Sequence, residues 1–102
     1  MKKIILFLGL FDKDSKAQEV STLDAFKIAS NLLTDIIGFG TITEAVGVYT
    51  HDDGTIVNEP TLRIEVSGVE LEPMKRLAIA LKQAFNQESV AFEVVNSDFN
   101  FI

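Results

Sequence analysis

Two β-rich runs on either side of a single Asp-Gly pair constrain the fold of this chain most strongly. The runs, Ile42 to Tyr49 and Ile56 to Val66, are rich in Val, Ile, Thr and aromatic residues, which suit a pleated, half-buried surface. Asp53-Gly54 between them is a strong turn signal, because glycine accepts a positive φ without steric cost and Asp tolerates it. The pattern predicts a β-hairpin.

The register of this hairpin requires one extra residue. Alternation places one apolar set on a face of each run: Ile42, Val46 and Val48 on the first, and Leu62, Ile64 and Val66 on the second. A two-residue turn on Asp53-Gly54 would put the two sets on opposite faces of the hairpin. We expect a bulge at Glu59-Pro60 to absorb the extra residue, because proline lacks an amide donor and is tolerated at bulges. A three-residue turn loop is the competing explanation.

Length and composition predict one globular domain spanning residues 1–102. With 47% apolar residues, a chain of this length can bury a single core. It contains no cysteine, which excludes disulfides, a thiol nucleophile and a Cys-based zinc site and fits a reducing, cytoplasmic location. We expect no cofactor.

The net charge of −6 argues against nucleic acid or an anionic membrane as the main partner, because both select basic surfaces. A basic protein partner is compatible with this charge, and so is an ordinary soluble protein whose charge serves solubility.

The first apolar run, Ile4 to Phe11, is apolar on both faces, which is typical of a strand in the interior of a sheet. One face carries Ile4, Leu6, Leu8 and Leu10, and the other carries Ile5, Phe7 and Phe11. The run is too short to span a membrane, and no A-x-A-like cleavage site follows it.

Two helices and a last strand complete the prediction. Ser21 and Asp24 form a capping box before a helix that ends near Gly38, and Pro73 fits the first position of a second helix. The expected buried stripes are Ala25, Phe26, Ala29, Leu32, Leu33, Ile36 and Ile37 in the first helix, and Met74, Leu77, Ala78, Leu81, Ala84 and Phe85 in the second. Alternation predicts a strand over Ser89 to Val95, and the apolar tail Asn96 to Ile102 is expected to dock on the domain.

The order strand, helix, strand, strand, helix, strand predicts an α+β, ferredoxin-like fold with a four-stranded antiparallel sheet and two helices on one face. The other face of the sheet is then open and carries Ile5, Phe7, Phe11 and Tyr49. Because an exposed apolar patch on a soluble domain usually marks an interface, we expect these residues to form a homodimer contact or to meet another protein partner.

Three short motifs are spread along the chain: Phe7-x-Gly9-Leu10, Gly47-x-Tyr49 with Asp53-Gly54-x-Ile56-Val57-x-Glu59-Pro60, and Gln87-Glu88-Ser89-Val90. With these motifs the chain resembles a family of small uncharacterised bacterial proteins, some carried by phages and mobile elements, that is classed as a domain of unknown function. The resemblance implies one compact α+β domain and an accessory or host-interaction role, and it supplies no catalytic residue.

Candidate chemistry is concentrated near the hairpin. His51, beside Asp52 and Asp53, is a potential general base, although neighbouring residues in a turn point in different directions and an exposed hairpin tip is the simpler interpretation. On the open sheet face, Tyr49 and Arg63 can contact a small anion or an amide, or they can form a cross-strand pair.

Two acidic features complete the candidate set. Asp52, Asp53, Asn58 and Glu59 carry oxygen ligands, but their spacing does not match a calcium loop and we expect no metal. Glu44 shares a strand face with apolar residues, so it is either a buried functional carboxylate or an edge residue that reaches water.

The sequence is compatible with three functions. The first is a non-enzymatic, homo-oligomeric interaction or accessory module. The second is a small enzyme or ligand-binding domain with a polar cleft near Tyr49, His51, Glu59 and Arg63. The third is an acidic inhibitor encoded by a phage or mobile element.

Overall fold

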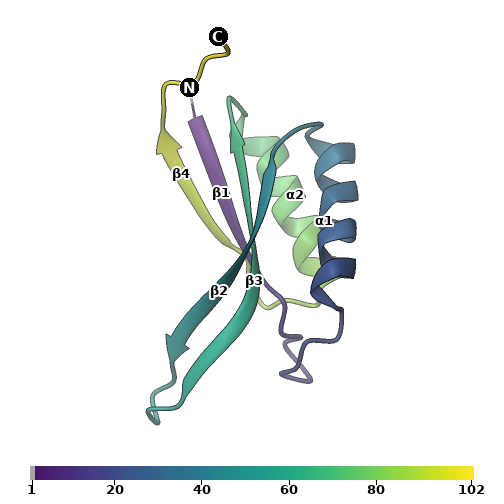
Figure 1. Ribbon diagram of the computed structural model, residues 1–102, viewed down its shortest axis with the longest axis vertical. Helices are drawn as coiled ribbons and strands as arrows, with labels where there is room; N and C mark the ends of the chain where they lie inside the picture. Colours follow the sequence, from purple (N-terminus) through teal and green to yellow (C-terminus); the bar gives the residue numbers. More distant parts are fainter. Residues whose placement is uncertain (1) are drawn as a thin grey trace.

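A computed structural model describes residues 2–102 and contains six elements in the predicted order (Figure 1). They are β1 (Lys2–Gly9), α1 (Thr22–Ile36), β2 (Thr41–Thr50), β3 (Ile56–Ser67), α2 (Leu71–Ala84) and β4 (Ala91–Asn96). The predicted cap of α1 is present, because the Ser21 hydroxyl accepts the Asp24 amide at 3.1 Å. Pro73 lies at the third position of α2 and not at the first, but it remains within the first turn, where its missing N–H costs no helical bond.

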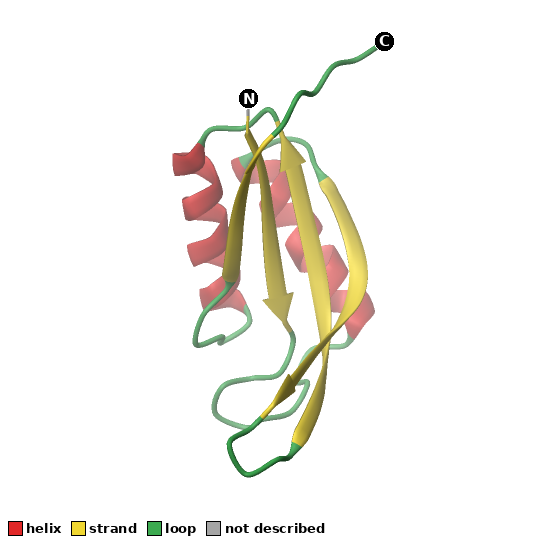
Figure 2. Ribbon diagram, turned by 90° about the vertical axis from the view of Figure 1, so that its left-hand side faces the viewer, coloured by secondary structure: helices red, strands yellow, loops and turns green. Residues whose placement is uncertain are grey.

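The four strands form one antiparallel sheet in the order β2-β3-β1-β4. Both helices cover the same face of this sheet, and the other face is open (Figures 1 and 2). This arrangement confirms the predicted ferredoxin-like α+β fold, with the first and third strands in the centre.

The core lies between the sheet and the two helices. Ile4, Leu6 and Leu8 of β1 are fully buried there, as the alternation in β1 predicts. They pack in one cluster with residues of β3, α1 and α2: Leu62, Ile64, Val66, Ala25, Ala29, Leu33, Met74, Leu77 and Leu81. Phe26 was expected in this core but is 40% exposed, because it lies at the outer margin of the apolar stripe of α1.

The hairpin is in register without a bulge, so the expected bulge at Glu59-Pro60 is wrong. β2 and β3 pair continuously from Thr41 with Glu65 to Thr50 with Ile56. The extra residue lies in a three-residue loop, closed by the His51 N–H on the Thr55 carbonyl at 2.8 Å. The Pro60 carbonyl accepts the Leu10 N–H on the β1 side, so the missing proline donor also faces away from β2.

The molecule is elongated, because one segment projects from each end. The β2–β3 hairpin extends past the helices as an arm at one end, and the C-terminal tail projects at the other end (Figures 1 and 2). The molecule therefore measures 47 × 26 × 23 Å. The expected docking of the tail is wrong, since Phe101 is 91% exposed and its ring contacts Phe99 edge-on, with the ring centres 5.1 Å apart.

Candidate ligand-binding cleft

A hollow of about 1030 Å³ lies on the open face of the sheet. Its sides come from the hairpin arm, from the loop that follows β1 and from the loop between α2 and β4. Its lining is Phe7, Gly9, Phe11, Asp12, Lys13, Lys16, Ala45, Val46, Gly47, Tyr49, His51, Val57, Glu59, Thr61, Gln87, Glu88, Ser89 and Ala91. We call this hollow the open-face cleft.

The strands carry two glycines at this part of the open face. Gly9 of β1 lies opposite Thr61, and Gly47 of β2 lies opposite Glu59, so one position on each side of β3 lacks a side chain. A Cβ atom at Gly47 would lie 3.1 Å from the Thr61 hydroxyl oxygen, which is tighter than most real contacts. Side chains of β3 use the space that the glycines leave: the Glu59 carboxylate lies over Gly9, and the Thr61 hydroxyl lies beside Gly47. Phe7 and Tyr49 also line the cleft.

Glu59 is the acidic group at the floor of the cleft. Its side chain crosses over Gly9, where an added Cβ would lie 2.5 Å from the Oε2 atom. The Phe11 N–H donates to this same oxygen at 2.8 Å. Gly9 and the Phe11 amide therefore fix a half-buried carboxylate in the cleft, and a fixed carboxylate is suited to hold a cationic group.

Two loops that form a side of the cleft are bonded to each other. The Asn86 side-chain amide donates to Asp12 Oδ2 at 3.0 Å and to Asp14 Oδ2 at 2.8 Å. Hydrogen bonds from Asn86, and then from the Ser15 and Asp14 amides, hold the pKa of Asp12 below its usual range. Asn86 has a left-handed φ of 48°, which Asn adopts more readily than most residues.

His51 lies at the far end of the cleft, on the exposed hairpin tip. Its ring packs edge-on against Tyr49, with ring centroids 5.4 Å apart. Asp53 does not orient the imidazole in this structure, because its Oδ1 atom accepts the Thr55 N–H at 2.9 Å and completes the turn. That bond is the main reason why the pKa of Asp53 lies below its usual value. The tripeptide thus forms a turn and not a catalytic dyad.

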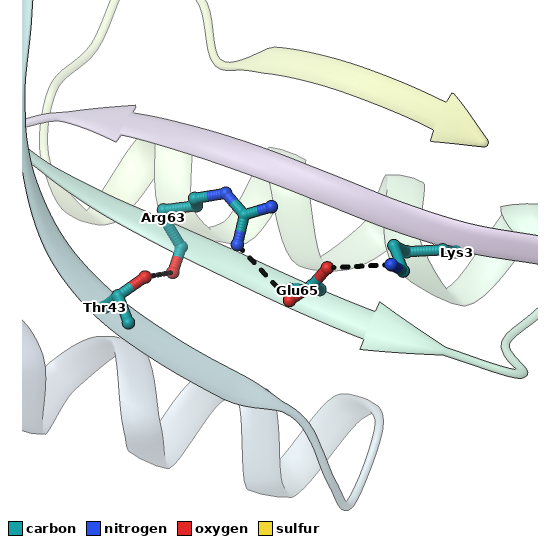
Figure 3. A network of polar contacts seen from close by, with 4 residues as sticks. All are labelled: Lys3, Thr43, Arg63 and Glu65. Carbon is teal, nitrogen blue, oxygen red and sulfur yellow. Dashed lines mark hydrogen bonds and ion pairs between the residues drawn. The ribbon is translucent and has the colours of Figure 1, made fainter. Parts of the chain in front are cut away.

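Arg63 does not line the cleft, although it shares the open face with Glu59. It pairs with Glu65 at 3.3 Å, and Lys3 approaches the other oxygen of Glu65 at the same distance (Figure 3). These bonds, Arg63 first, hold the pKa of Glu65 below its usual range. Ile5 lies opposite Glu65 on this face and is only 6% exposed, so it has little surface left for a partner.

The structure brings together most of the predicted site residues. Tyr49, His51 and Glu59 line the open-face cleft, and so do Phe7 and Phe11, which were expected in an oligomer interface. The ligand site and the interface expected from the sequence thus occupy the same surface. Nine residues of the three motifs quoted above line it: Phe7, Gly9, Gly47, Tyr49, Val57, Glu59, Gln87, Glu88 and Ser89.

The two remaining acidic candidates from the sequence are Glu44 and the set of oxygen ligands around the hairpin turn. Glu44 is exposed on the edge strand β2, so its carboxylate reaches water. Within residues 2–102 no group of three or more His, Asp or Glu side chains is placed to hold a metal ion.

Sequence reasoning missed the roles of three residues around Glu59. The sequence marks Gly9 only as part of a family motif, and it predicts a strand that includes Phe11. Gln87 is buried and bonds the Phe11 carbonyl at 2.6 Å. A polar residue directly after an amphipathic helix is normally exposed, so no local signal marks its burial.

Comparison with protein-family models gives no match, and neither does comparison with curated proteins. Solved structures do match. A phage SAM lyase in complex with S-methyl-5'-thioadenosine has 24% identity and a TM-score of 0.67, over 92% of this chain and 79% of that one. The apo state of a phage SAM lyase has 23% identity and a TM-score of 0.63, over 92% and 78% of the two chains.

The PII-like protein CutA from Nostoc has 17% identity and a TM-score of 0.61, over 96% of this chain and 82% of that one. At these identities the likenesses show the fold, which this chain shares with both kinds of protein.

None of the helices in residues 2–102 has the length and apolar character needed to cross a membrane.

Proposed function

We propose that this chain is a small-molecule-binding domain whose open-face cleft accepts a cationic nucleoside of the S-adenosylmethionine class. The observation that carries the proposal is the Glu59 carboxylate, which the Phe11 N–H and the bare Gly9 backbone hold in the cleft. One of its oxygens accepts that amide, and the other has no hydrogen-bond partner within residues 2–102. A sulfonium or an amine is the complementary ligand group.

The other parts of the cleft suit the remainder of such a ligand. Its volume, about 1030 Å³, is at the upper end of the range usual for small-molecule sites. Phe7, Phe11 and Tyr49 supply aromatic faces, which attract cations and stack on planar bases. Lys13 and Lys16 lie in the lining and can meet a ligand carboxylate.

The structural neighbours favour this ligand class over other cations. A phage SAM lyase with the same fold has been solved with S-methyl-5'-thioadenosine bound, at a TM-score of 0.67. S-methyl-5'-thioadenosine retains the adenosyl and methylthio groups of S-adenosylmethionine and lacks its positive charge.

Glu59 is assigned to binding and not to bond cleavage. When S-adenosylmethionine releases S-methyl-5'-thioadenosine, the bond between sulfur and the methionyl γ-carbon breaks and its electron pair stays on sulfur, while the substrate's own carboxylate oxygen forms the new bond to that carbon and closes a lactone. The positive charge is lost in this step, so a carboxylate beside the sulfur stabilises the substrate more than the transition state. Glu59 therefore increases affinity for the charged compound.

The proposal is tested by a titration of ¹⁵N-labelled protein with S-adenosylmethionine, followed by amide resonances. We expect the shifts to cluster at Gly9, Phe11, Gly47 and Gln87. Shifts confined to the helices, or no shift at millimolar ligand, would overturn it. Chromatography of the same samples measures any S-methyl-5'-thioadenosine formed above the uncatalysed rate.

Two variants assign the binding energy. Glu59→Gln keeps the side-chain shape and removes the charge, so we expect about a tenfold loss of affinity, which corresponds to about 1.4 kcal/mol. Glu93→Gln is the matched control. Glu93 lies in β4 on the same open face of the sheet as Glu59, but it is exposed and does not line the cleft. Equal affinities of the two variants would remove Glu59 from the site.

A second candidate function, homo-oligomerisation, has its own observation. Phe7 is 36% exposed and Tyr49 is 44% exposed on a sheet face that no helix covers. We expect a second copy to pack here, since exposed apolar surface of this kind is usually part of an interface.

Light scattering of the native protein and of Phe7→Glu tests this candidate. Leu23→Glu is the control, because Leu23 is 64% exposed on α1, on the opposite side of the sheet. A dimer or higher oligomer that only Phe7→Glu dissociates supports the interface. An oligomer that survives Phe7→Glu contradicts it.

A further inference from the structure

Gln87 is one of two buried polar residues in the part of the chain that the structure describes, with 8% of its surface exposed. It lies just beyond the end of α2, where Asn86 takes a left-handed backbone conformation. The Gln87 N–H then donates back to the Lys82 carbonyl at 2.9 Å, as in a common helix-ending motif. This reversal turns the Gln87 side chain inward, toward the loop that follows β1.

The side-chain amide of Gln87 bonds the backbone of Phe11. Its Nε2 atom donates to the Phe11 carbonyl at 2.6 Å and more weakly to the Phe85 carbonyl at 3.4 Å. The N–H of the same residue, Phe11, donates to Glu59 Oε2 at 2.8 Å. Phe11 is thus held on both sides, by Gln87 through its carbonyl and by Glu59 through its amide.

The neighbouring Asn86 makes a different connection. Its side chain bonds Asp12, which is partly buried, and Asp14, which is exposed. Asn86 is therefore bonded to residues that follow Phe11 in the loop, while Gln87 is bonded to the one residue whose amide holds Glu59.

We propose that Gln87 is a positioning residue for the open-face cleft: by fixing the Phe11 carbonyl, it aims the Phe11 N–H at Glu59 and keeps that carboxylate over Gly9. The link to ligand selectivity rests on the function proposed above, whereas the positioning of Glu59 does not. Because Gln87 is buried, loss of its bond to the Phe11 carbonyl would leave the side-chain amide away from water without an acceptor. The desolvation cost of that state favours the bonded arrangement.

The direct test is the Phe11 amide resonance in the protein without ligand. An amide that donates to a carboxylate resonates downfield and exchanges slowly with water. Gln87→Met has a similar volume and no donor, so we expect the Phe11 amide to move upfield and to exchange about tenfold faster. Asn86→Gly keeps the left-handed backbone and the bond from the Lys13 N–H to the carbonyl of residue 86. It removes only the side-chain bonds to Asp12 and Asp14, so it should leave this resonance in place.

A second variant gives a signature that loss of packing cannot produce. In Gln87→Glu, the carboxyl donates to the Phe11 carbonyl only while it is protonated. Burial beside two carbonyl oxygens favours that neutral form. Glu59 and Asp12 also carry carboxyl groups beside Phe11, so the native protein is followed over the same pH range as the reference. We expect Gln87→Glu to match the native Phe11 resonance at acidic pH and to depart from it as the new carboxyl ionises, which also keeps the test valid if Gln87→Met does not fold.

Ligand selectivity completes the test. Gln87→Met should lower the preference for S-adenosylmethionine over the uncharged S-adenosylhomocysteine by about tenfold, and Asn86→Gly should retain it. An unchanged Phe11 amide in both Gln87 variants would overturn the positioning role. If the amide responds in the free protein but no adenosyl compound binds the native chain, the positioning stands and the proposed ligand falls.

Discussion

Gly9→Ala is the substitution whose effect the structure defines most closely. A Cβ atom at this position would lie 2.5 Å from Glu59 Oε2, whereas ordinary contacts begin near 3.4 Å. The carboxylate must move by the difference, about 0.9 Å, and it can do so cheaply because it is the end of a flexible side chain. The movement breaks the 2.8 Å bond from the Phe11 N–H.

The expected cost follows from two opposing effects. A hydrogen bond to a charged group contributes about 1.5 to 3 kcal/mol, and water partly replaces it because Glu59 is only half-buried. Alanine in the extended backbone at the end of β1 returns roughly 0.5 to 1 kcal/mol relative to glycine, because it loses less conformational freedom on folding. We therefore expect Gly9→Ala to lower the free energy of unfolding by about 1 kcal/mol, or the Tm by roughly 4 to 8 °C.

A double-mutant cycle tests the reasoning by urea unfolding. In the Glu59→Ala background the collision is absent, so Gly9→Ala should be neutral or stabilising by about 0.5 kcal/mol. The coupling between the two positions is then about 1 to 1.5 kcal/mol. If Gly9→Ala costs the same in both backgrounds, the close approach of Gly9 and Glu59 does not govern this site.

Three further predictions concern the scaffold. Gly54→Ala should lower the free energy of unfolding by about 1 kcal/mol, because Gly54 has a φ of +88°, which alanine adopts only with strain. No atom lies within 4 Å of the added Cβ, so the loss reports the backbone conformation alone, and an unchanged Tm would contradict the turn geometry. Ser21→Ala should cost about 1 kcal/mol of helix capping, seen by thermal unfolding, and Ser21→Asp should restore it. The pKa of Glu65 is lowered on folding, so the ionised carboxylate stabilises the fold fully above the ordinary pKa of 4.5, and this stabilisation is lost as the pH falls through the lower pKa of the folded state. Glu65→Gln should therefore flatten the acid side of a curve of unfolding free energy against pH. Acid sides with the same slope in both proteins would contradict the pairing.

Local patterns predicted the elements and their order, because the signals involved act over a few residues. The Ser21 cap, the doubly apolar β1 and the turn at Gly54 each depend on neighbours in the sequence. The register of the hairpin was harder, since a bulge at Glu59-Pro60 and a three-residue loop restore the same alternation. The structure selects the loop.

The cleft was predictable only in part, because its geometry depends on contacts between distant residues. Tyr49, His51 and Glu59 were found as a group because they share one hairpin face or its tip. Arg63 shares that face too, but its bond to Glu65 and its position farther along β3 keep it outside the lining. The position of a residue along its strand and its side-chain partners thus decide whether it lines the cleft.

Gln87 illustrates the same limit more sharply. It meets Phe11, a residue 76 positions earlier in the chain, only after the helix end has turned its side chain inward. Neither residue carries a sequence signal for this bond.

The most direct test of the central account is the affinity ratio between S-adenosylmethionine and S-adenosylhomocysteine, measured by calorimetry for the native protein and Glu59→Gln. The two ligands differ by one methyl group and one positive charge, so the ratio isolates the contribution of the charge. We predict that the native protein prefers the charged ligand by about tenfold and that Glu59→Gln loses this preference. A preference that persists in Glu59→Gln, or a native protein that binds both ligands equally, would contradict the account.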